Sequence, residues 1–288
     1  MPRLFERVTI AGVGLIGGSL ALAARNAGLI GTVVGLGRSE TNLRTAQQRG
    51  IIDRFSHDAL DAARDADLLL LAVPVQRMAA VAQACVPALS AGAVVSDVGS
   101  VKATVVREVE AVLPAGITFV GTHPIAGTEE SGAAAARADL FRGHRCIITP
   151  SHSSSAEALT KIRALWEGVG MQVSEMDAVR HDEILAWVSH LPHAIAFSAV
   201  NALLDLDGAI ATFAGPSHRD LTRVAGSSVE MWRDIFVANS DQVAIAITRF
   251  IAVLEQLRAA IIQRDEAKLG SVLERAQTAR RRWTTGQR

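Results

Sequence analysis

The sequence predicts an α/β fold in which a Rossmann-type, doubly wound and mostly parallel sheet precedes an all-helical part. Over the first 176 residues, short and continuously apolar runs alternate with amphipathic stretches. Such runs are typical of parallel strands covered on both faces, and the alternation of strand and helix indicates a doubly wound sheet. After about Asp177 the pattern changes to long helices. We therefore expect one domain over residues 1–176 and a second, helical domain over residues 177–288.

The predicted elements of the first domain alternate along the chain. Strands are expected at Val8–Ala11, Thr32–Leu36, Leu68–Val73, Ala93–Asp97, Ile117–Gly121, Cys146–Thr149 and Met171–Glu175. Helices are expected at Leu15–Ala27, Glu40–Arg49, Arg77–Ala88, Lys102–Val112 and Ser155–Val169.

The second domain shows helical patterns only. They cover Ala178–Asp205, Ala209–Phe213, Ser228–Ala238 and Gln242–Arg264. The stretch Ser240–Ile262 has apolar residues on more than one face, which is too many for a single helix surrounded by water. We therefore expect a buried seam there, either between helices or between two copies of the chain.

Composition narrows the classes of function. Lys plus Arg and Asp plus Glu both number 29, so no overall charge favours nucleic acid or an anionic membrane, and a small-molecule site is expected. Only Cys85 and Cys146 occur, outside any CxxC pattern, which argues against a disulfide framework or a cysteine zinc site and suits a reducing cytoplasm. The longest apolar stretch, Leu68–Val75, is too short to span a bilayer. The chain has no tyrosine, so a mechanism with a tyrosine acid is excluded.

A glycine-rich turn follows the first predicted strand. Gly12, Gly14 and Gly17 form the pattern GxGxxG between a strand and a helix. In that setting the glycines permit a tight turn, close approach of a pyrophosphate and close helix–strand packing, while N–H groups and the helix dipole hold the phosphates. The first domain is therefore predicted to bind a dinucleotide. The expected cofactor contacts here are Gly12, Gly14, Leu15, Ile16, Gly17, Val73 and Pro74.

The end of the second predicted strand indicates which dinucleotide binds. Folds that bind NAD usually carry Asp or Glu there for the ribose 2′-hydroxyl, but this chain has Gly37 followed by Arg38 and Ser39. An arginine fork and a serine hydroxyl can hold a 2′-phosphate, which a carboxylate would repel. We therefore expect NADP as the preferred cofactor, with NAD as the alternative. In that alternative Arg38 is a solvated loop residue and Glu40 contacts the ribose.

Two residues near strand ends are candidates for the chemistry, because ligands of open α/β sheets bind beyond the carboxyl ends of the strands. Ser100 follows the strand that ends at Asp97. The structural alternative is that it caps the next helix, but its hydroxyl would still point into the cleft where a nicotinamide would lie. His123 follows Gly121, and Pro124 keeps a helix from starting at once. An imidazole accepts a proton near neutral pH, so His123 is the candidate general base toward a substrate hydroxyl.

The helical domain contributes further polar candidates. His181, His190 and His193 share one predicted helix, and the last two can face the same side. No third ligand has a suitable spacing, so a polar face turned toward the cleft is favoured over a metal site. Arg223 precedes a helix that contains Trp232, and a guanidinium matches a carboxylate bidentately.

Five motifs occur in a fixed order. They are GVGLIGGS at residues 12–19, DVGSVK at 97–102, HPIAGTE at 123–129, SHLPH at 189–193, and TRVA at 222–225 with Trp232. Together they closely resemble the prephenate/arogenate (cyclohexadienyl) dehydrogenases of tyrosine biosynthesis, from about residue 6 to about residue 265.

The resemblance implies that a hydride passes from C4 of a cyclohexadienyl ring to the nicotinamide while the ring carboxylate leaves as carbon dioxide. It implies that His123 accepts the proton of the C4 hydroxyl, that Ser100 supports it, and that Arg223 holds a substrate carboxylate. It also implies a homodimer paired through the helical domain. The implied pocket lining is His190, His193, Glu129 and Trp232.

Alternatives stay open at this point. Other Rossmann/helical dehydrogenases, which act on hydroxy acids or imines, often use a lysine on the first long helix of the second domain, and Ala178–Asp205 contains none. A non-catalytic NADP-sensing protein would need the glycine turn but neither the histidines nor Arg223. The choice between prephenate and arogenate is also open, with a preference for prephenate because His193 beside His190 suits a more anionic side chain.

Overall fold

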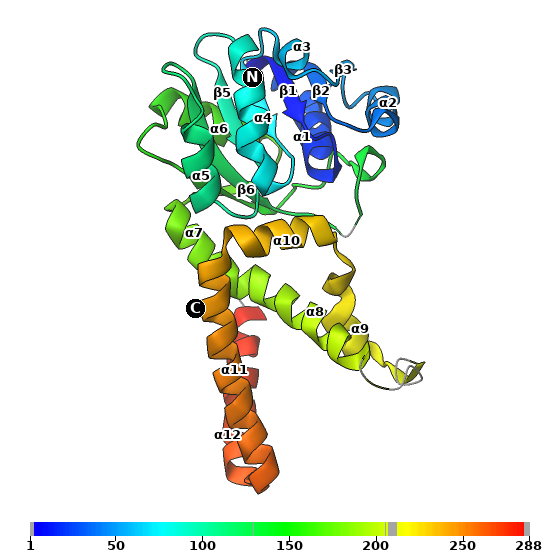
Figure 1. The fold of residues 1–288 in the computed structure, drawn as a ribbon, viewed down its shortest axis with the longest axis vertical. Coiled ribbons are helices and arrows are strands. Elements are labelled where there is room, and N and C mark those ends of the chain that lie inside the picture. The colour runs from blue at the N-terminus through cyan, green and yellow to red at the C-terminus, as the bar shows by residue number, and fades with distance from the viewer. Residues whose placement is uncertain (1–2, 129, 205, 207–211, 285–288) are drawn as a thin grey trace. The chain divides into compact units, whose positions relative to one another are not determined.

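The computed structural model describes residues 3–128, 130–204, 206 and 212–284, and it divides into two units, residues 1–240 and 241–288. Within the described residues the first unit holds one sheet with the strand order β3-β2-β1-β4-β5-β6-β7-β8 (Figure 1). The strands are β1 (Phe5–Ala11), β2 (Ile30–Leu36), β3 (Arg54–Ser56), β4 (Leu68–Leu71), β5 (Val94–Asp97), β6 (Thr118–Ile125), β7 (Arg145–Thr149) and β8 (Gln172–Glu175).

The strand order reverses next to β1, because β2 lies on one side of it and β4 on the other. Strands β1 to β6 pair in parallel, β7 is antiparallel to β6, and β8 is parallel to β7. A doubly wound, mostly parallel sheet is thus confirmed. In such sheets the ligand crevice lies outside the carboxyl ends of the strands, where the order reverses.

Two apolar cores cover the two faces of the sheet. The helices of this part are α1 (Leu15–Asn26), α2 (Glu40–Gln48), α3 (Ala59–Ala63), α4 (Met78–Cys85), α5 (Ala103–Glu110) and α6 (Ala156–Gly168), with 3-10 turns η1 (Val75–Arg77), η2 (Val86–Ala88) and η3 (Ala133–Ala135). On β4, Leu68 and Leu70 point into one core with α1 and α6, and Leu69 and Leu71 point into the other with α4 and α5. Both faces of the strand are buried, which explains its unbroken apolar run.

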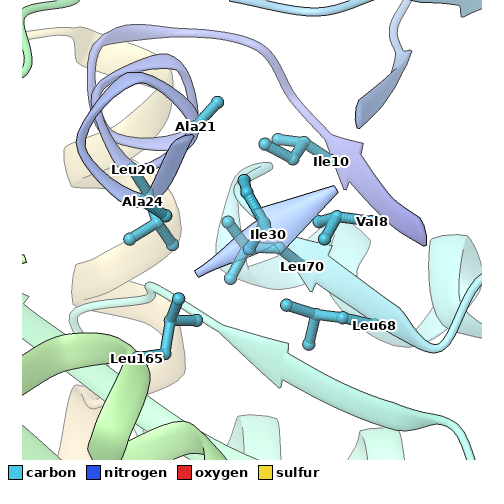
Figure 2. Close-up of a pocket in the computed structure, with 9 residues that line it drawn as sticks. All are labelled: Val8, Ile10, Leu20, Ala21, Ala24, Ile30, Leu68, Leu70 and Leu165. Carbon is cyan, nitrogen blue, oxygen red and sulfur yellow. The ribbon is translucent and has the colours of Figure 1, made fainter. Parts of the chain in front are cut away.

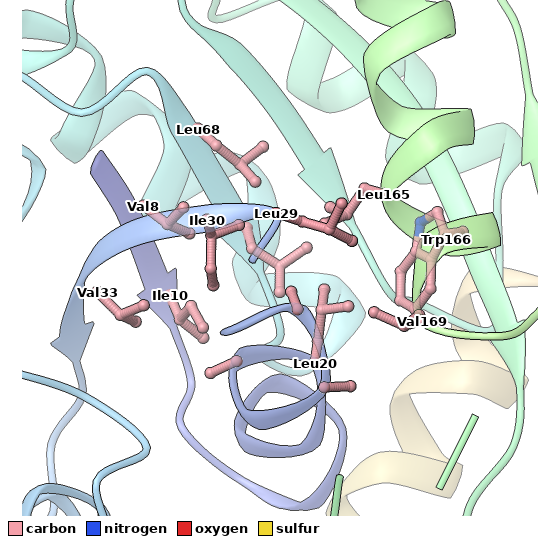
Figure 3. Close-up of a cluster of buried hydrophobic side chains, with 14 of the residues drawn as sticks. Val8, Ile10, Leu20, Leu29, Ile30, Val33, Leu68, Leu165, Trp166 and Val169 are labelled. Atoms are coloured by element: carbon pink, nitrogen blue, oxygen red, sulfur yellow. The ribbon is translucent and has the colours of Figure 1, made fainter. Parts of the chain in front are cut away.

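The core under α1 and α6 is closely packed (Figure 3). It contains a void of about 10 Å³ between the sheet, α1 and Leu165 (Figure 2). Only apolar side chains line that void, and it has room for no more than one water, so it is no ligand site.

The chain beyond the sheet is helical, as predicted. It forms α7 (Ala178–Leu185), the π-turn η4 (Ala186–His190), α8 (Leu191–Leu204), α9 (Pro216–Thr222), the 3-10 turn η6 (Arg223–Gly226), α10 (Val229–Ala238), α11 (Ser240–Gln263) and α12 (Glu266–Thr284). No helix within the described ranges is both long enough and apolar enough to cross a membrane. The domain boundary between residues 176 and 177 stays a prediction.

Several predicted bounds were wrong. The helix predicted at Ala178–Asp205 is interrupted by the π-turn, and its last residue lies outside the described residues. Of the helix predicted at Ala209–Phe213, residues 209–211 also lie outside them. Strand β6 extends through Ile125 instead of ending at Gly121, because β7 pairs with its last five residues. The short elements β3 and α3 and the helices α9 and α12 were not predicted.

Candidate active site at the carboxyl ends of the strands

The glycine turn between β1 and α1 has the geometry that a pyrophosphate requires. Gly12 has φ +94°, and a Cβ there would fall 2.2 Å from the carbonyl oxygen of Ala72, so only glycine fits without displacing the chain after β4. A Cβ on Gly14 would meet nothing within 4 Å, which leaves open space beside the backbone. Helix α1 begins at Leu15 without a side-chain cap. The first turn of the helix therefore has N–H donors available for an anion.

Neighbouring segments fix this turn. Asn42 on α2 donates from Nδ2 to the carbonyl oxygen of Val13 at 2.8 Å and accepts at Oδ1 from the N–H of Ala133 at 2.7 Å. The segments after β4 and after β6 also approach the turn. A Cβ on Gly12 would lie 3.1 Å from the nitrogen of Val73, next to Pro74, and a Cβ on Gly127 would lie 3.9 Å from Cδ1 of Ile16.

The end of β2 is followed by one basic side chain, Arg38, and one hydroxyl side chain, Ser39. Arg38 and Ser39 are exposed there, and Ser39 caps α2 by accepting from the N–H of Asn42. Glu40 is paired with Arg44, whose Nη2 lies 2.6 Å from the Glu40 carboxylate. The carboxylate of Glu40 is thus engaged by its own helix, which speaks against the alternative in which it contacts a ribose.

His123 lies inside β6, opposite Ile147 of β7, and is 8% exposed. Its Nδ1 lies 2.8 Å from Nε2 of His181, which comes from α7. Burial holds the pKa of His123 well below its usual value, and His181, the ammonium of Lys102 and His190 lower it further. His123 is therefore a neutral imidazole at pH 7 and can accept a hydrogen bond or a proton.

Next to His123, the β5–α5 loop is held by a buried ion pair. The Lys102 ammonium binds the Asp97 carboxylate and donates to the carbonyl oxygen of Thr122 at 2.8 Å. Asp97 also accepts from the N–H groups of Gly99 and Thr122. All these groups are paired, so the loop that contains Ser100 is fixed relative to the end of β6.

Ser100 does not cap α5, which was the purely structural alternative for this residue. Helix α5 begins at Ala103, and the carboxylate that caps it comes from Asp182 on α7. The Asp182 oxygens accept from the N–H groups of Lys102 and Ala103, both at 2.8 Å. Figure 1 shows α7 directly beneath α5. The cap thus joins the helical part to the sheet.

His190 is completely buried behind this loop, at the end of the π-turn. Its Nδ1 lies 3.1 Å from Nδ2 of Asn239, which also donates to the carbonyl oxygen of Asp182 at 2.9 Å. Burial lowers the pKa of His190 to about 4, opposed by the charge of Asp182 and by the backbone of Ser100. His190 therefore lies against the backbone of the β5–α5 loop at Ser100.

His193, Trp232 and Arg223 form a second cluster in the helical part. The His193 ring stacks on Trp232, with ring centroids 3.6 Å apart and planes inclined by 21°. Burial lowers the pKa of His193, the Ser189 carbonyl opposes this, and the nearby Arg223 guanidinium lowers it further. Trp232 packs in turn on Val101, next to Ser100. The cluster therefore adjoins the loop beside His123.

The structure thus brings His123, Ser100, His190, His193, Trp232 and Arg223 into one connected region of the first unit. Glu129 lies outside the described residues. Among residues 3–128, 130–204, 206 and 212–284, no three side chains of His, Cys, Asp or Glu could hold a metal ion.

Sequence reasoning missed three residues of this region: Asp182, Asn239 and, as a partner of His123, His181. The adjacent pair His181–Asp182 was a usable signal. Its partner could not be identified, because His123 lies 58 residues away in the sequence.

Comparison with known proteins gives consistent matches. The prephenate dehydrogenase nucleotide-binding domain matches residues 20–175, and the prephenate dehydrogenase dimerization domain matches residues 177–275. A cyclohexadienyl dehydrogenase from Zymomonas mobilis is 37% identical over 96% of both chains, and a prephenate dehydrogenase from Bacillus subtilis is 32% identical over 93% of this chain and 74% of its own. The crystal structure of prephenate dehydrogenase from Aquifex aeolicus, in complex with hydroxyphenyl propionate and NAD⁺, superposes with a TM-score of 0.90 at 34% identity, covering 96% of this chain and 97% of the other.

Proposed function

Because the chain belongs to the prephenate dehydrogenase family, we propose that it catalyses the oxidative decarboxylation of prephenate to 4-hydroxyphenylpyruvate, with arogenate as the alternative substrate that gives tyrosine. One observation carries the proposal. His123 is a buried, neutral imidazole near the carboxyl end of β6, and the cluster of His193, Trp232 and Arg223 adjoins the β5–α5 loop beside it. A proton acceptor and a cation for a carboxylate therefore belong to one region.

The glycine turn fits a nicotinamide dinucleotide, which when bound accepts a hydride. Gly14 leaves space for a pyrophosphate, and the uncapped start of α1 supplies donors. The cofactor contacts in this proposal are Gly12, Gly14, Leu15, Ile16, Gly17, Val73 and Pro74. We propose NADP as the preferred cofactor, because Arg38 and Ser39 are exposed where a 2′-phosphate would lie and Glu40 is engaged by Arg44.

The side chains have separate tasks in this reaction. The hydrogen on C4 leaves with its bonding electrons, and His123 takes the proton of the C4 hydroxyl at Nε2, the nitrogen not engaged by His181. The C4 carbonyl then forms. The ring carboxylate leaves as carbon dioxide, and the electrons of the broken carbon–carbon bond complete the aromatic ring. The proton returns to the phenolate oxygen, so no proton is gained or lost overall.

Substrate binding requires positive charge and donors, because burying an unpaired carboxylate is costly. Arg223 would bind a carboxylate, and the stacked pair of His193 and Trp232 would form a wall of the pocket. Ser100 would support His123 from the β5–α5 loop. His190 and Glu129 complete the proposed set, His190 by holding that loop. A dianionic substrate would also raise the pKa of His123 and make it a better proton acceptor.

We also propose a homodimer paired through the helical domain. The match to a dimerization domain supports this, and so do exposed apolar side chains on α11. These are Ile245, Ile251, Val253, Leu254, Ile261 and Ile262. A cytoplasmic location is part of the proposal, supported by the buried and unpaired thiols of Cys85 and Cys146.

The test of the function is a set of four steady-state assays, with prephenate and arogenate each combined with NADP⁺ and NAD⁺. We expect turnover of prephenate with the highest kcat/KM for NADP⁺. Turnover of 3-hydroxy acids without activity on either cyclohexadienyl substrate would contradict the proposal, and so would nucleotide binding without any reduction.

A further inference from the structure

His181 is a completely buried histidine for which the proposed reaction has no direct use. It lies on α7, and its Nε2 is 2.8 Å from Nδ1 of His123. Its other nitrogen, Nδ1, is 2.8 Å from Oδ1 of Asp182. The two rings meet edge to face, with centroids 5.1 Å apart and an angle of 62° between their planes. The three side chains form one continuous line of hydrogen bonds.

The chemistry of the groups fixes the direction of each hydrogen bond in this line. The Asp182 carboxylate accepts from the N–H groups of Lys102 and Ala103, and it can only accept from His181 as well. Nδ1 of His181 therefore carries a proton. Burial lowers the pKa of His181, so at neutral pH the ring has no second proton and its Nε2 is an acceptor. Nδ1 of His123 must then be the donor, which leaves Nε2 of His123 with a free lone pair.

We propose that His181 and Asp182 are positioning residues that hold His123 in the tautomer protonated at Nδ1, so that its Nε2 is the proton acceptor for the substrate hydroxyl. The role in catalysis rests on the proposed function, whereas the tautomer does not. Without the acceptor at His181, an isolated imidazole would populate both tautomers, and the one protonated at Nε2 could not accept the substrate proton.

The other groups that face His123 do not supply this function. Lys102 is near, but its ammonium is taken by Asp97 and the Thr122 carbonyl, and it is a donor only. His190 is near and bonded to Asn239. Asp182 also caps α5, so its replacement would loosen the loop of Ser100 for a purely structural reason. His181 is therefore the residue whose replacement tests the proposal.

The direct test is ¹⁵N NMR of the imidazole nitrogens in the full-length protein without substrate, with His123→Asn used to assign the His123 signals. Three further variants are needed. His181→Leu removes the acceptor, His181→Gln places an amide oxygen near the former Nε2, and His152→Leu changes an exposed histidine as the matched control. Wild type, His181→Gln and His152→Leu should show His123 protonated at Nδ1 alone. His181→Leu should show both tautomers.

Kinetics provide the second readout. His181→Leu should lower kcat by roughly 10–100-fold with little change in KM for prephenate, a smaller loss than the ~10⁴-fold drop known for an imidazole held wholly in the wrong tautomer. His181→Gln should recover most of this loss, which a general packing defect would not allow. Protonation of His123 at Nε2 in the wild type would overturn the proposal, and so would an unchanged tautomer and kcat in His181→Leu. If prephenate is not turned over at all, the proposed function fails while the NMR still decides the tautomer.

Discussion

Acid should destabilise this protein in part through the buried histidine His190. His190 has no exposed surface, and Asn239 donates to its Nδ1. Burial lowers the pKa of His190 from 6.5 to about 4 in the folded chain. In the unfolded chain the ring is in water and keeps its ordinary pKa near 6.5. As the pH falls, the unfolded chain therefore takes up the proton first, and the folded state loses stability from about pH 6.5 down to about pH 4.

The size of the effect follows from the two pKa values. One pKa unit corresponds to 1.36 kcal/mol, so the uptake of a proton by His190 should lower the free energy of unfolding by about 2 kcal/mol between pH 7 and pH 5. Other buried histidines and the carboxylates add their own pH dependence, so the contribution must be isolated by a variant. His190→Asn removes the titration and keeps an oxygen acceptor toward Asn239. His152→Asn is the matched control, because His152 is exposed.

The assay is urea unfolding of the wild type and both variants at pH 7 and pH 5. The wild type and His152→Asn should lose about 2 kcal/mol more of their unfolding free energy on acidification than His190→Asn loses. His190→Asn is expected to be less stable than the wild type at pH 7, so only the change with pH is compared. The same change in all three proteins would show that His190 is protonated without cost in the fold, contrary to this prediction.

Three further predictions concern the site. Lys102→Met should lower the free energy of unfolding by about 3–5 kcal/mol in chemical denaturation, because it leaves the Asp97 carboxylate buried without its cation. A decrease below about 1 kcal/mol would contradict a stabilising role of the ion pair. Arg223→Ala should raise KM for prephenate by roughly 10–100-fold, the equivalent of one hydrogen bond between charged groups, and an unchanged KM in steady-state assays would remove the carboxylate contact. Combining Gly37→Asp with Arg38→Ala should shift the ratio of kcat/KM from NADP⁺ toward NAD⁺, and an unchanged ratio would mean that the 2′-phosphate is held elsewhere.

The parts of the fold that depend on local pattern were predictable from the sequence. The glycine turn is an example. Gly12 has a positive φ and lies close to the backbone of Ala72, and glycine, which defines the motif at this position, permits both. The buried strands were visible because parallel strands covered on both faces lack polar positions. Strand β3 has only three residues and no pattern of its own, so it was missed.

Features that depend on distant partners were not predictable in the same way. The extension of β6 past Gly121 requires β7 as an antiparallel partner, and this places His123 inside a strand instead of after it. The π-turn before Leu191 was missed, although Pro192 directly after it lacks the N–H group of a regular helix and marks an interruption. The bond from His123 to His181 joins segments that only the folded chain brings together. Local chemistry identified the candidate residues, and tertiary structure decided how they are paired.

The proposed reaction depends most on His123 as the proton acceptor for the substrate hydroxyl. The direct measurement is kcat for prephenate with NADP⁺ in the wild type and in His123→Asn, with nucleotide affinity measured separately to confirm that the cofactor site is intact. We expect kcat to fall by about 10²–10⁴-fold while KM and nucleotide affinity change little, the usual range for the loss of a general base. A kcat close to that of the wild type would contradict the role of His123, because the proton would then leave the substrate without it.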